Sequence, residues 1–203
     1  MKFSKFFSRL QEEPWYREFL RPVIHRVEEH SNLLDIGTGS GKLLEIICKE
    51  KSVKATGVDT SSEMLAEATR KLINTNARLL LVDAGRKLPF KKNTFDFISV
   101  CNVLFHIKQA AIERMLDEYI GLLKPSGKII VLTPTGKGNI IQLAWHFLSL
   151  KNLGIFIWYS ATKKRSIQWG NNGILKCYSI KNNLDYHKEI TLKGFAVVET
   201  IQV

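Results

Sequence analysis

The pattern of apolar and polar positions changes at residue 31. From there to about residue 133, short apolar runs alternate with amphipathic stretches, and these runs are the predicted strands: Asn32–Ile36, Val53–Val58, Ala77–Val82, Thr94–Val100 and Lys128–Thr133. Helical spacing between the runs predicts helices at three places: Lys42–Lys51, a segment capped by Thr60 or Ser61, and Ile107–Leu123. Apolar strands separated by helices are typical of a parallel sheet covered on both faces. The pattern therefore predicts a doubly wound, mostly parallel α/β fold.

The first 30 residues show helical spacing instead. Apolar residues recur at that spacing on both sides of Pro14, and Pro22 predicts a second helix start or a kink. Because Arg9, Glu12 and Glu13 interrupt the apolar positions, the segment lacks the apolar run of a signal peptide. We therefore expect an N-terminal helical cap over residues 1–30.

A very apolar stretch, Asn139–Tyr159, follows the fifth predicted strand. It is nearly long enough to span a bilayer, but Lys151, Asn152 and Gly154 interrupt it, and a charge inside lipid is costly. We therefore favour a helix and a loop that lie over the carboxyl edge of the sheet. Such a cap would cover a pocket or touch a membrane surface.

The pattern after this stretch predicts three further elements. They are a loop over Gln168–Gly173, an amphipathic helix over Ser179–Lys193 closed by Gly194, and a final strand over Phe195–Val203. These elements predict one more strand at the end of the sheet.

Composition is that of an ordinary globular protein. Of 203 residues, 45% are apolar and 24% are charged, which argues against a disordered, collagen-like or coiled-coil chain. The cysteines, Cys48, Cys101 and Cys177, are far apart and form no CxxC pair. This spacing argues against a disulfide framework and a cysteine-rich zinc site. We expect no metal site and a reducing, cytoplasmic setting.

The net charge of +11 is concentrated in the C-terminal third of the chain. Nine basic residues lie between Lys137 and Lys193, against two acids, Asp185 and Glu189. A basic surface of this kind favours polyanions, anionic lipid or acidic substrates. The alternative is a solvated basic face with no partner.

A glycine-rich turn follows the first predicted strand and leads into a helix. Its glycines, Gly37, Gly39 and Gly41, let the backbone adopt positive φ and let a ligand approach without meeting a β-carbon. The spacing is GxGxG, whereas the dinucleotide fingerprint places its third glycine one residue later. Asp35 precedes the turn, and its carboxylate would repel a pyrophosphate but suit an ammonium or sulfonium ligand. A nicotinamide dehydrogenase is therefore disfavoured.

Two further acids end the next two predicted strands. Asp59 stands where a carboxylate can accept both hydroxyls of a ribose, with Met64 placed to pack on an adenine. Asp83 and Ala84 follow the third strand, where the amino edge of the adenine would be read. The carboxyl ends of parallel strands meet at one crevice, so we expect the three acids to converge. The alternative for Asp59 is a helix N-cap with no ligand.

The order of these motifs resembles the class I S-adenosylmethionine-dependent methyltransferases, of the small-molecule type that includes quinone-ring methylating enzymes. The similar segments are LLDIGTGSGKLL, ATGVDTSSEML, LVDAGRKLPFKKNTFDFISV, CNVLFHI, LKPSGKIIVLTP and CYSIKNNLDYHKEITLKGFAVVE. The resemblance is close over residues 31–135 and moderate over 177–203. It implies a Rossmann-like fold and S-adenosylmethionine as the cofactor, with S-adenosylhomocysteine as its product.

The resemblance also implies roles for individual residues. The amino-acid part of the cofactor would lie over Asp35 and the glycine turn, Asp59 would hold the ribose, and Asp83 would read the adenine. The expected cofactor-binding residues are Asp35, Gly37, Thr38, Gly39, Gly41, Asp59, Thr60, Met64, Asp83, Ala84, Asn102 and Val103. The expected substrate-side residues are Trp15, Tyr16, Arg17, Trp145 and His146.

The chain departs from the family pattern in two places. The family has a seventh strand antiparallel beside the sixth, but this chain ends directly after the predicted last strand. We therefore expect a sheet lacking the usual seventh strand, unless Ile174–Tyr178 substitutes or the chain is truncated. The stretch 137–176 is also longer and more apolar than a minimal member needs, which leaves the substrate class open.

Methyl transfer from a sulfonium mainly requires alignment and exclusion of water. A general base is needed only where the acceptor must lose a proton. His106, just after the fourth strand, is the candidate base, and its alternatives are a helix-capping or pocket-lining role. By resemblance, Asn102-Val103-Leu104-Phe105 in place of an Asn/Asp-Pro-Pro-aromatic motif argues against nucleobase amines and glutamine amides as acceptors.

We expect one methyltransferase domain over residues 1–203. Its parts are a helical cap (1–30), a cofactor-binding core (31–135), a substrate-side insertion (136–178) and the last helix and strand (179–203). The favoured function is methylation of a small, apolar or lipid-like acceptor, with peripheral contact to an anionic membrane surface. The alternatives are an RNA or protein methyltransferase that docks through the basic C-terminal third, and a non-catalytic S-adenosylmethionine-binding protein. We see no RNA-binding module.

Overall fold

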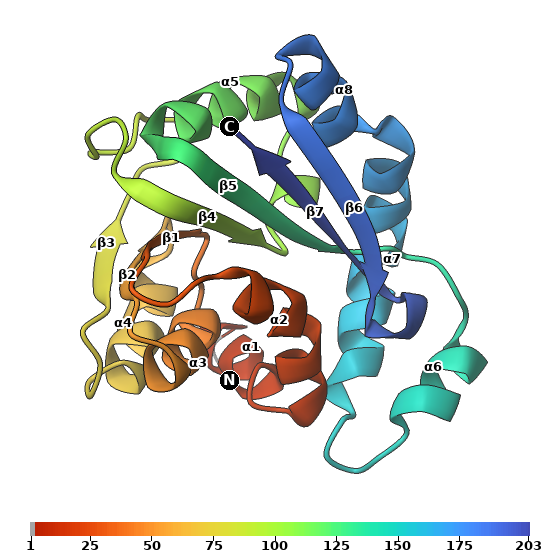
Figure 1. Ribbon diagram of the computed structural model, residues 1–203. Helices are drawn as coiled ribbons and strands as arrows, with labels where there is room; N and C mark the ends of the chain where they lie inside the picture. The colour runs from red at the N-terminus through yellow and green to blue at the C-terminus, as the bar shows by residue number, and fades with distance from the viewer. Residues whose placement is uncertain (1–2) are drawn as a thin grey trace.

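The computed structural model describes residues 3–203, so the first two residues of the expected N-terminal cap lie outside the described residues. Seven strands form one sheet in the order β3-β2-β1-β4-β5-β7-β6 (Figure 1). The strands are β1 Asn32–Ile36, β2 Lys54–Asp59, β3 Arg78–Leu81, β4 Phe95–Cys101, β5 Leu123–Pro134, β6 Asp185–Thr191 and β7 Ala196–Gln202. The strands β1 to β5 pair in parallel, and β7 is antiparallel to both β5 and β6. The predicted doubly wound, mostly parallel fold is confirmed.

Helices cover both faces of the sheet. They are α1 Phe3–Leu10, α2 Pro14–Arg26, α3 Lys42–Glu50, α4 Ser62–Lys71, α5 Gln109–Leu122, α6 Ile140–Phe147, α7 Gly154–Asn172 and α8 Ile174–Lys181, with short 3-10 turns η1 Leu104–His106 and η2 Leu192–Gly194. In Figure 1, α5 and α8 lie above the sheet, and α1, α2 and α3 lie below it. The helix α7 contributes buried residues to the cores on both sides, so it passes around the edge of the sheet.

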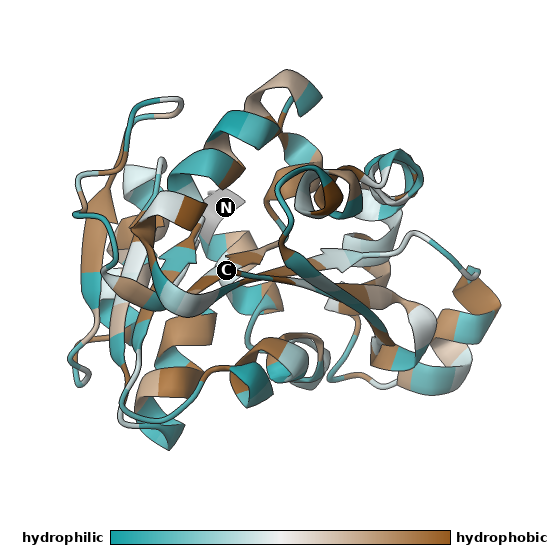
Figure 2. Cartoon of the chain, turned by 45° about the horizontal axis from the view of Figure 1, so that its top comes forward, coloured by the Kyte–Doolittle hydropathy of each residue, from teal (hydrophilic) through white to brown (hydrophobic). Residues whose placement is uncertain are grey.

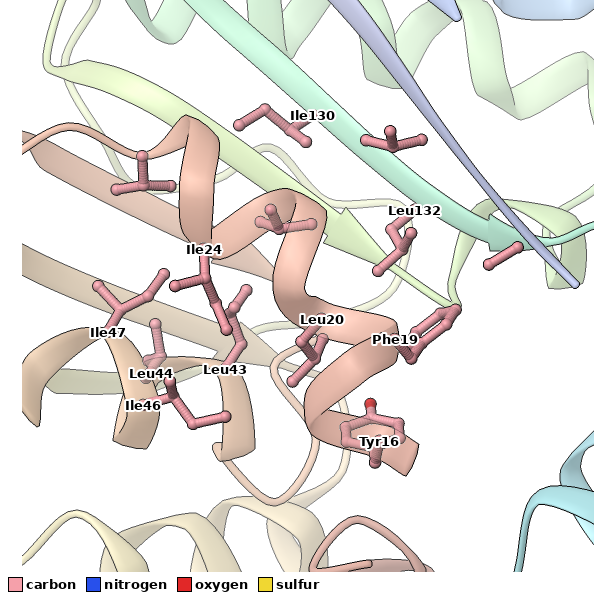
Figure 3. Close-up of a cluster of buried hydrophobic side chains, with 14 of the residues drawn as sticks. Tyr16, Phe19, Leu20, Ile24, Leu43, Leu44, Ile46, Ile47, Ile130 and Leu132 are labelled. Atoms are coloured by element: carbon pink, nitrogen blue, oxygen red, sulfur yellow. The ribbon is translucent and has the colours of Figure 1, made fainter. Parts of the chain in front are cut away.

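The core follows from the alternation of side chains along the strands. Leu33 of β1 faces the side covered by α2 and α3, whereas its neighbour Leu34 faces α5. Figure 3 shows the first of these cores, in which Phe19 of α2 lies beside Leu132 of β5, and Leu44 of α3 lies in a separate group with Ile47. Fully burying one such side chain stabilises the fold by roughly 1.5–3 kcal/mol. The N-terminal cap is thus held by apolar packing on the sheet.

The same alternation gathers polar residues on one face. The register of β1 places Asp35 opposite Gly57 of β2 on one side and Ser99 of β4 on the other. Residues opposite each other in a parallel pair point to the same face. Asp35, Asp59 and Ser99 therefore share the face covered by the N-terminal helices.

The expectation of a missing seventh strand is wrong. The segment predicted as one helix over Ser179–Lys193 contains the end of α8, a turn and the strand β6. Asn183 adopts a φ of 53° in that turn, which ends the helix. Because β6 lies at the sheet edge, most of its residues are exposed and show no apolar alternation. Nor does Ile174–Tyr178 substitute as a strand, since it lies in α8.

One smaller expectation also fails, and one of the two alternatives stated for Pro22 is excluded. Gln168–Gly173 is not a loop, because α7 continues to Asn172 and ends only at Gly173, which has a φ of 57°. Pro22 does not start a new helix but lies inside α2. The Arg26 Nη1 donates to the Pro22 carbonyl at 2.9 Å within the same helix.

Among residues 3–203, no helix combines the length and the apolar character needed to cross a bilayer. The described part of the chain likewise contains no group of three or more His, Cys, Asp or Glu arranged to hold a metal. Its cysteines are free thiols.

Candidate cofactor site

The glycine turn after β1 presents open backbone to the carboxyl edge of the sheet. Gly37, Gly39 and Gly41 have φ values of 69°, 57° and 79°, which side-chain-bearing residues rarely adopt. A β-carbon at Gly37 would lie 2.4 Å from Cγ2 of Val103, so Val103 packs directly against the turn. At Gly41 it would lie 3.1 Å from Cβ of Ala68, so this glycine lets α4 approach closely. The first two glycines thus shape the ligand side, and the third serves helix packing.

Asp35 is a buried carboxylate beneath this turn. Its side chain is 2% exposed, and the Ser99 hydroxyl donates to its Oδ1 at 2.7 Å. Burial, with a smaller contribution from the charge of Asp59, raises the pKa of Asp35 to about 6. No lysine or arginine among the described residues forms an ion pair with it, so this charge is available for a cationic ligand.

Asp59 links the end of β2 to the glycine turn. Its Oδ2 accepts a hydrogen bond from the Gly39 N–H at 2.8 Å, and its Oδ1 accepts one from the Ser61 N–H at 2.9 Å. The N-cap of α4 is Ser61, whose hydroxyl accepts from the Met64 N–H at 3.2 Å. Asp59 is therefore not the N-cap. Each carboxylate oxygen keeps a second lone pair for a hydroxyl donor.

The residues after β4 hold buried polar atoms that lack a well-formed hydrogen bond. Asn102 adopts a φ of 59°, and its buried side-chain oxygen and nitrogen make no hydrogen bond of good geometry within residues 3–203, although the Tyr16 hydroxyl lies close enough to interact with this side chain. The Thr38 hydroxyl likewise makes no hydrogen bond of good geometry, although it interacts with the Asp35 carboxylate. Buried polar groups are normally hydrogen-bonded, and strained backbone concentrates at functional sites. Open backbone, two carboxylates and these polar atoms together fit a nucleoside with an amino-acid tail, as S-adenosylmethionine has.

A hydrogen-bond chain joins the N-terminal cap to the turn. The Ser40 hydroxyl donates to Oε1 of Gln11, whose Nε2 donates to the Tyr16 hydroxyl at 2.8 Å. Burial raises the pKa of Tyr16, and Cys101 and Asp35 add to the effect because they lie nearby. Tyr16 therefore lies near the glycine turn and Asp35. Gln11, which is 4% exposed, was not predicted at this place, because a single polar residue between two helices forms no recognisable sequence pattern.

The third acid differs from the first two. Asp83 is exposed and pairs with Arg86 at 3.2 Å, and Ala84 is also exposed. The pairing of Asp59 with Leu81 places Asp83 two residues beyond this register, at the same sheet edge. Met64 is half-buried on α4, whereas Thr60 is exposed. The structure therefore brings Asp35 and Asp59 together and leaves Asp83 on the rim, partly neutralised.

Four of the five expected substrate-side residues do not lie at the glycine turn. Trp15 is 2% exposed and packs against Trp158 of α7, with ring centroids 5.1 Å apart. Arg17 pairs with Glu50, the last residue of α3, whereas the glycine turn precedes the first residue of that helix. Trp145 and His146 are exposed on α6. Of this group, the structure brings only Tyr16 to the glycine turn.

His106 ends η1, beyond Asn102 and Val103. The Arg165 Nη1 donates to its Nδ1 at 2.7 Å. Because a guanidinium has no acceptor, Nδ1 must accept, and the neutral ring then carries its proton on Nε2. Burial, followed by the charge of Arg165, lowers the pKa of His106. The free nitrogen in this arrangement is a hydrogen-bond donor and not a base.

A cavity of about 150 Å³ lies on the other face of the sheet, beneath the turn between α7 and α8. It begins at Pro134 and Thr135, where β5 ends, and its apolar walls include Trp169 and Leu175. The buried carboxylate of Glu199 lines it and accepts a hydrogen bond from the Tyr186 hydroxyl. No glycine-turn residue lines this cavity, so it is separate from the cofactor site.

Comparison with known proteins shows what this geometry is similar to. A family model described as a methyltransferase domain matches residues 33–127. The demethylmenaquinone methyltransferase of Symbiobacterium thermophilum is 34% identical over 127 residues, which are 60% of this chain and 49% of the relative. The protein of the same name from Chlorobaculum tepidum is 29% identical over 126 residues, 62% of this chain and 50% of the relative. The chain thus spans about half the length of these curated relatives.

A solved structure shares the whole fold. A SAM-dependent methyltransferase from Aquifex aeolicus superposes with a TM-score of 0.71 over 100% of both chains, at 16% identity. At this identity the likeness concerns the fold alone. The matched segment 33–127 contains the glycine turn, the carboxylates of Asp35 and Asp59, and Asn102. Residues 33–127 therefore match a methyltransferase domain, in agreement with the resemblance to the class I S-adenosylmethionine-dependent methyltransferases.

Proposed function

We propose that this protein transfers a methyl group from S-adenosylmethionine to a small, apolar acceptor. The observation that carries the proposal is Asp35, a buried carboxylate without a cationic partner in the described residues, directly beneath an open glycine turn. A buried charge of this kind costs free energy unless something compensates it. The ammonium group of the cofactor would provide that compensation.

Each residue of the site has a role in binding or orientation. Asp35 would hold the ammonium, and Asp59 would accept the ribose hydroxyls while it fixes Gly39. The side chain of Asn102 would donate to and accept from the cofactor beside the transferred methyl. Bound S-adenosylmethionine supplies the activated methyl and a neutral thioether leaving group. The protein therefore mainly has to align the acceptor and exclude water.

The N-terminal cap supplies the exclusion of water. Gln11 and Tyr16 are buried over the turn, and Glu12 pairs with Lys71 at 2.6 Å. These contacts tie the cap to the turn and to α4. Because ligand must pass the cap, we expect its opening to accompany cofactor exchange.

The state of His106 favours a reaction without a histidine base. With Nδ1 occupied by Arg165, the other ring nitrogen carries an N–H. An N–H can orient or polarise an acceptor oxygen, but it cannot remove a proton. We therefore propose that His106 positions the acceptor, which either needs no deprotonation or ionises on its own.

Two observations support an apolar acceptor. The two curated relatives are named for demethylmenaquinone, a quinone. In this chain, α7 and α8 line the cavity beside the end of β5 with Ile167, Trp169, Ile174 and Leu175. We propose that the substrate-side segment 136–178 guides an apolar acceptor to the cofactor from this side.

Transfer of labelled methyl groups tests the proposal. The purified protein and tritiated S-adenosylmethionine are incubated separately with quinone-rich lipid extract, total RNA and protein extract. We expect label in the lipid fraction and none with the Asp35→Asn variant. Label confined to RNA or protein would favour docking through the basic C-terminal third instead. Cofactor binding without transfer to any fraction would contradict catalysis.

A further inference from the structure

The segment from α6 to the start of α7 exposes apolar side chains. Half of the large apolar side chains that are exposed in residues 5–203 lie within 140–157. They are Ile140, Ile141, Trp145, Leu148, Leu150, Leu153 and Ile157, of which Trp145 is 88% and Leu150 is 91% exposed. Large contiguous exposed apolar surfaces usually mark an interaction site.

The exposed apolar side chains of α6 belong to a well-formed helix. Asn139 and Gln142 form a capping box at the start of α6, and Leu143 is fully buried against the core. Ile141, Trp145 and Leu148 recur at the spacing that places them on one side, away from Leu143. The fold thus fixes α6 and turns its apolar side outward.

The shape of this region is convex. Figure 1 shows α6 and the loop that follows it projecting beyond the body of the molecule, and Figure 2 shows the apolar colouring of this projection. A projecting apolar helix needs a surface into which it can insert. A fluid bilayer interface meets this need without a matching groove, whereas a protein partner must supply one.

The charge around the projection is complementary to anionic lipid. Residues 119–184 contain no aspartate or glutamate. Lys137 and Lys151 are exposed on either side of α6, and Lys164 is exposed on α7. Exposed lysines next to inserted apolar side chains are attracted to the headgroups of anionic lipids.

We propose that residues 137–164 form a docking surface for anionic membranes, here called the α6 surface. Trp145, Leu148 and Leu150 insert at the level of the headgroups, and the neighbouring lysines contact lipid phosphates. The surface works without methyl transfer, so its test is independent of the proposed function. If the acceptor is membrane-dissolved, the same surface brings the acceptor-side segment to it.

Vesicle flotation tests the α6 surface directly. The probes are vesicles of phosphatidylcholine alone and of phosphatidylcholine mixed with phosphatidylglycerol. We expect the protein to float with the mixed vesicles and not with phosphatidylcholine, and to detach as salt rises from about 0.05 M to about 0.5 M. We also expect the fluorescence of Trp145 to shift to the blue on binding, and this shift to be absent in Trp145→Phe.

Matched variants separate the two contributions. Trp145→Ser combined with Leu150→Ser should weaken vesicle binding by roughly tenfold or more. Ile73→Ser is the control, because Ile73 is 78% exposed but lies after α4. Lys151→Gln with Lys164→Gln should remove the preference for anionic vesicles, whereas Lys91→Gln with Lys92→Gln, exposed elsewhere, should leave it intact.

Calorimetry with S-adenosylhomocysteine shows that each variant is folded and keeps its cofactor site. The proposal is overturned if the wild-type protein fails to bind mixed vesicles at low salt, or if the serine variants bind as well as the wild type. It is also overturned if the chain dimerises without lipid and Trp145→Ser abolishes the dimer. That result would assign the α6 surface to a second copy of the chain.

Discussion

The Gly39 N–H donates a hydrogen bond of 2.8 Å to the carboxylate of Asp59. This contact joins the turn after β1 to the end of β2, so the two halves of the cofactor site are held together before any ligand binds. The second oxygen of Asp59 accepts from Ser61 and fixes the start of α4 in the same way. The site is therefore preorganised by the residue that is also expected to bind the ribose.

Asp59→Ala should weaken both stability and binding. It leaves the N–H groups of Gly39 and Ser61 without their acceptor, which should lower the free energy of unfolding by about 1–3 kcal/mol. The loss of the ribose contact should reduce affinity for S-adenosylhomocysteine by roughly tenfold to a hundredfold. Urea denaturation and calorimetry measure the two effects.

Ser61→Ala is the matched control for this prediction. It removes the N-cap of α4 and should cost about 1 kcal/mol of stability. It leaves the Asp59 carboxylate in place, so affinity should stay close to that of the wild type. An equal loss of affinity in both variants would show that Asp59 acts only through the loop.

Asp35→Asn should stabilise the ligand-free protein at neutral pH. The pKa of Asp35 is raised from 3.8 to about 6, so the folded state disfavours the ionised form. The ionised Asp35 carboxylate therefore destabilises the folded protein. This destabilisation is absent below the unfolded-state pKa of 3.8, grows as the pH rises toward 6 and reaches its full value above pH 6. It amounts to at most about 3 kcal/mol.

Urea denaturation at two pH values measures this effect. The asparagine variant should be more stable than the wild type at about pH 7.5, and the gain should disappear at about pH 4. A variant that is less stable than the wild type at neutral pH would show that the buried charge is already compensated within the protein.

Gly37→Ala should damage the fold around the turn. The added β-carbon would lie 2.4 Å from Cγ2 of Val103 in a backbone with positive φ. Overpacking and strain together should cost about 2–5 kcal/mol. Gly85→Ala is the control, since Gly85 has a φ of 77° but no neighbour within 4 Å of its β-carbon position. It should lose only about 1–2 kcal/mol, and equal losses would remove Val103 from the explanation.

His106→Ala should retain most of its activity. Removal of a general base costs roughly 10²–10⁴-fold in rate, whereas loss of a positioning N–H should cost less than about tenfold in kcat. Arg165→Ala should free Nδ1 and raise the pKa of His106, because it removes a neighbouring positive charge. A loss of a hundredfold or more in His106→Ala would instead assign the ring as the base.

The strands β1 and β4 and the second half of β5 were predictable because they are buried on both faces, and the turn was predictable because it needs glycine. The strand β3 is a mostly exposed edge strand, and only its run of leucines made it predictable. The edge strand β6 was not predictable, since its side chains are mostly solvated and Lys188 and Glu189 occupy positions that a buried strand would fill with apolar residues. The same limit applies to α7, whose polar last turn resembles a loop in sequence.

Some residues of the candidate site could be predicted from their position at strand ends, and others could not. Asp35 and Asp59 were predictable because parallel strands bring their carboxyl ends together. The sequence does not show where a side chain lies in the folded protein. Trp15 and Arg17 were expected on the substrate side, but Trp15 packs against Trp158 in the core and Arg17 pairs with Glu50 at the end of α3. Gln11 needed the packed N-terminal cap to reveal its contact with Ser40.

The central claim is that Asp35 holds a cationic nucleoside cofactor, and calorimetry at two pH values tests it most directly. The wild type should bind S-adenosylhomocysteine one-to-one and give no heat with NAD, and its affinity should fall about tenfold between about pH 7.5 and about pH 5 as Asp35 takes up a proton. Asp35→Asn should bind more weakly than the wild type at neutral pH and show no change across this range. Binding of NAD, or an affinity for S-adenosylhomocysteine that is the same in both proteins and at both pH values, would contradict the account.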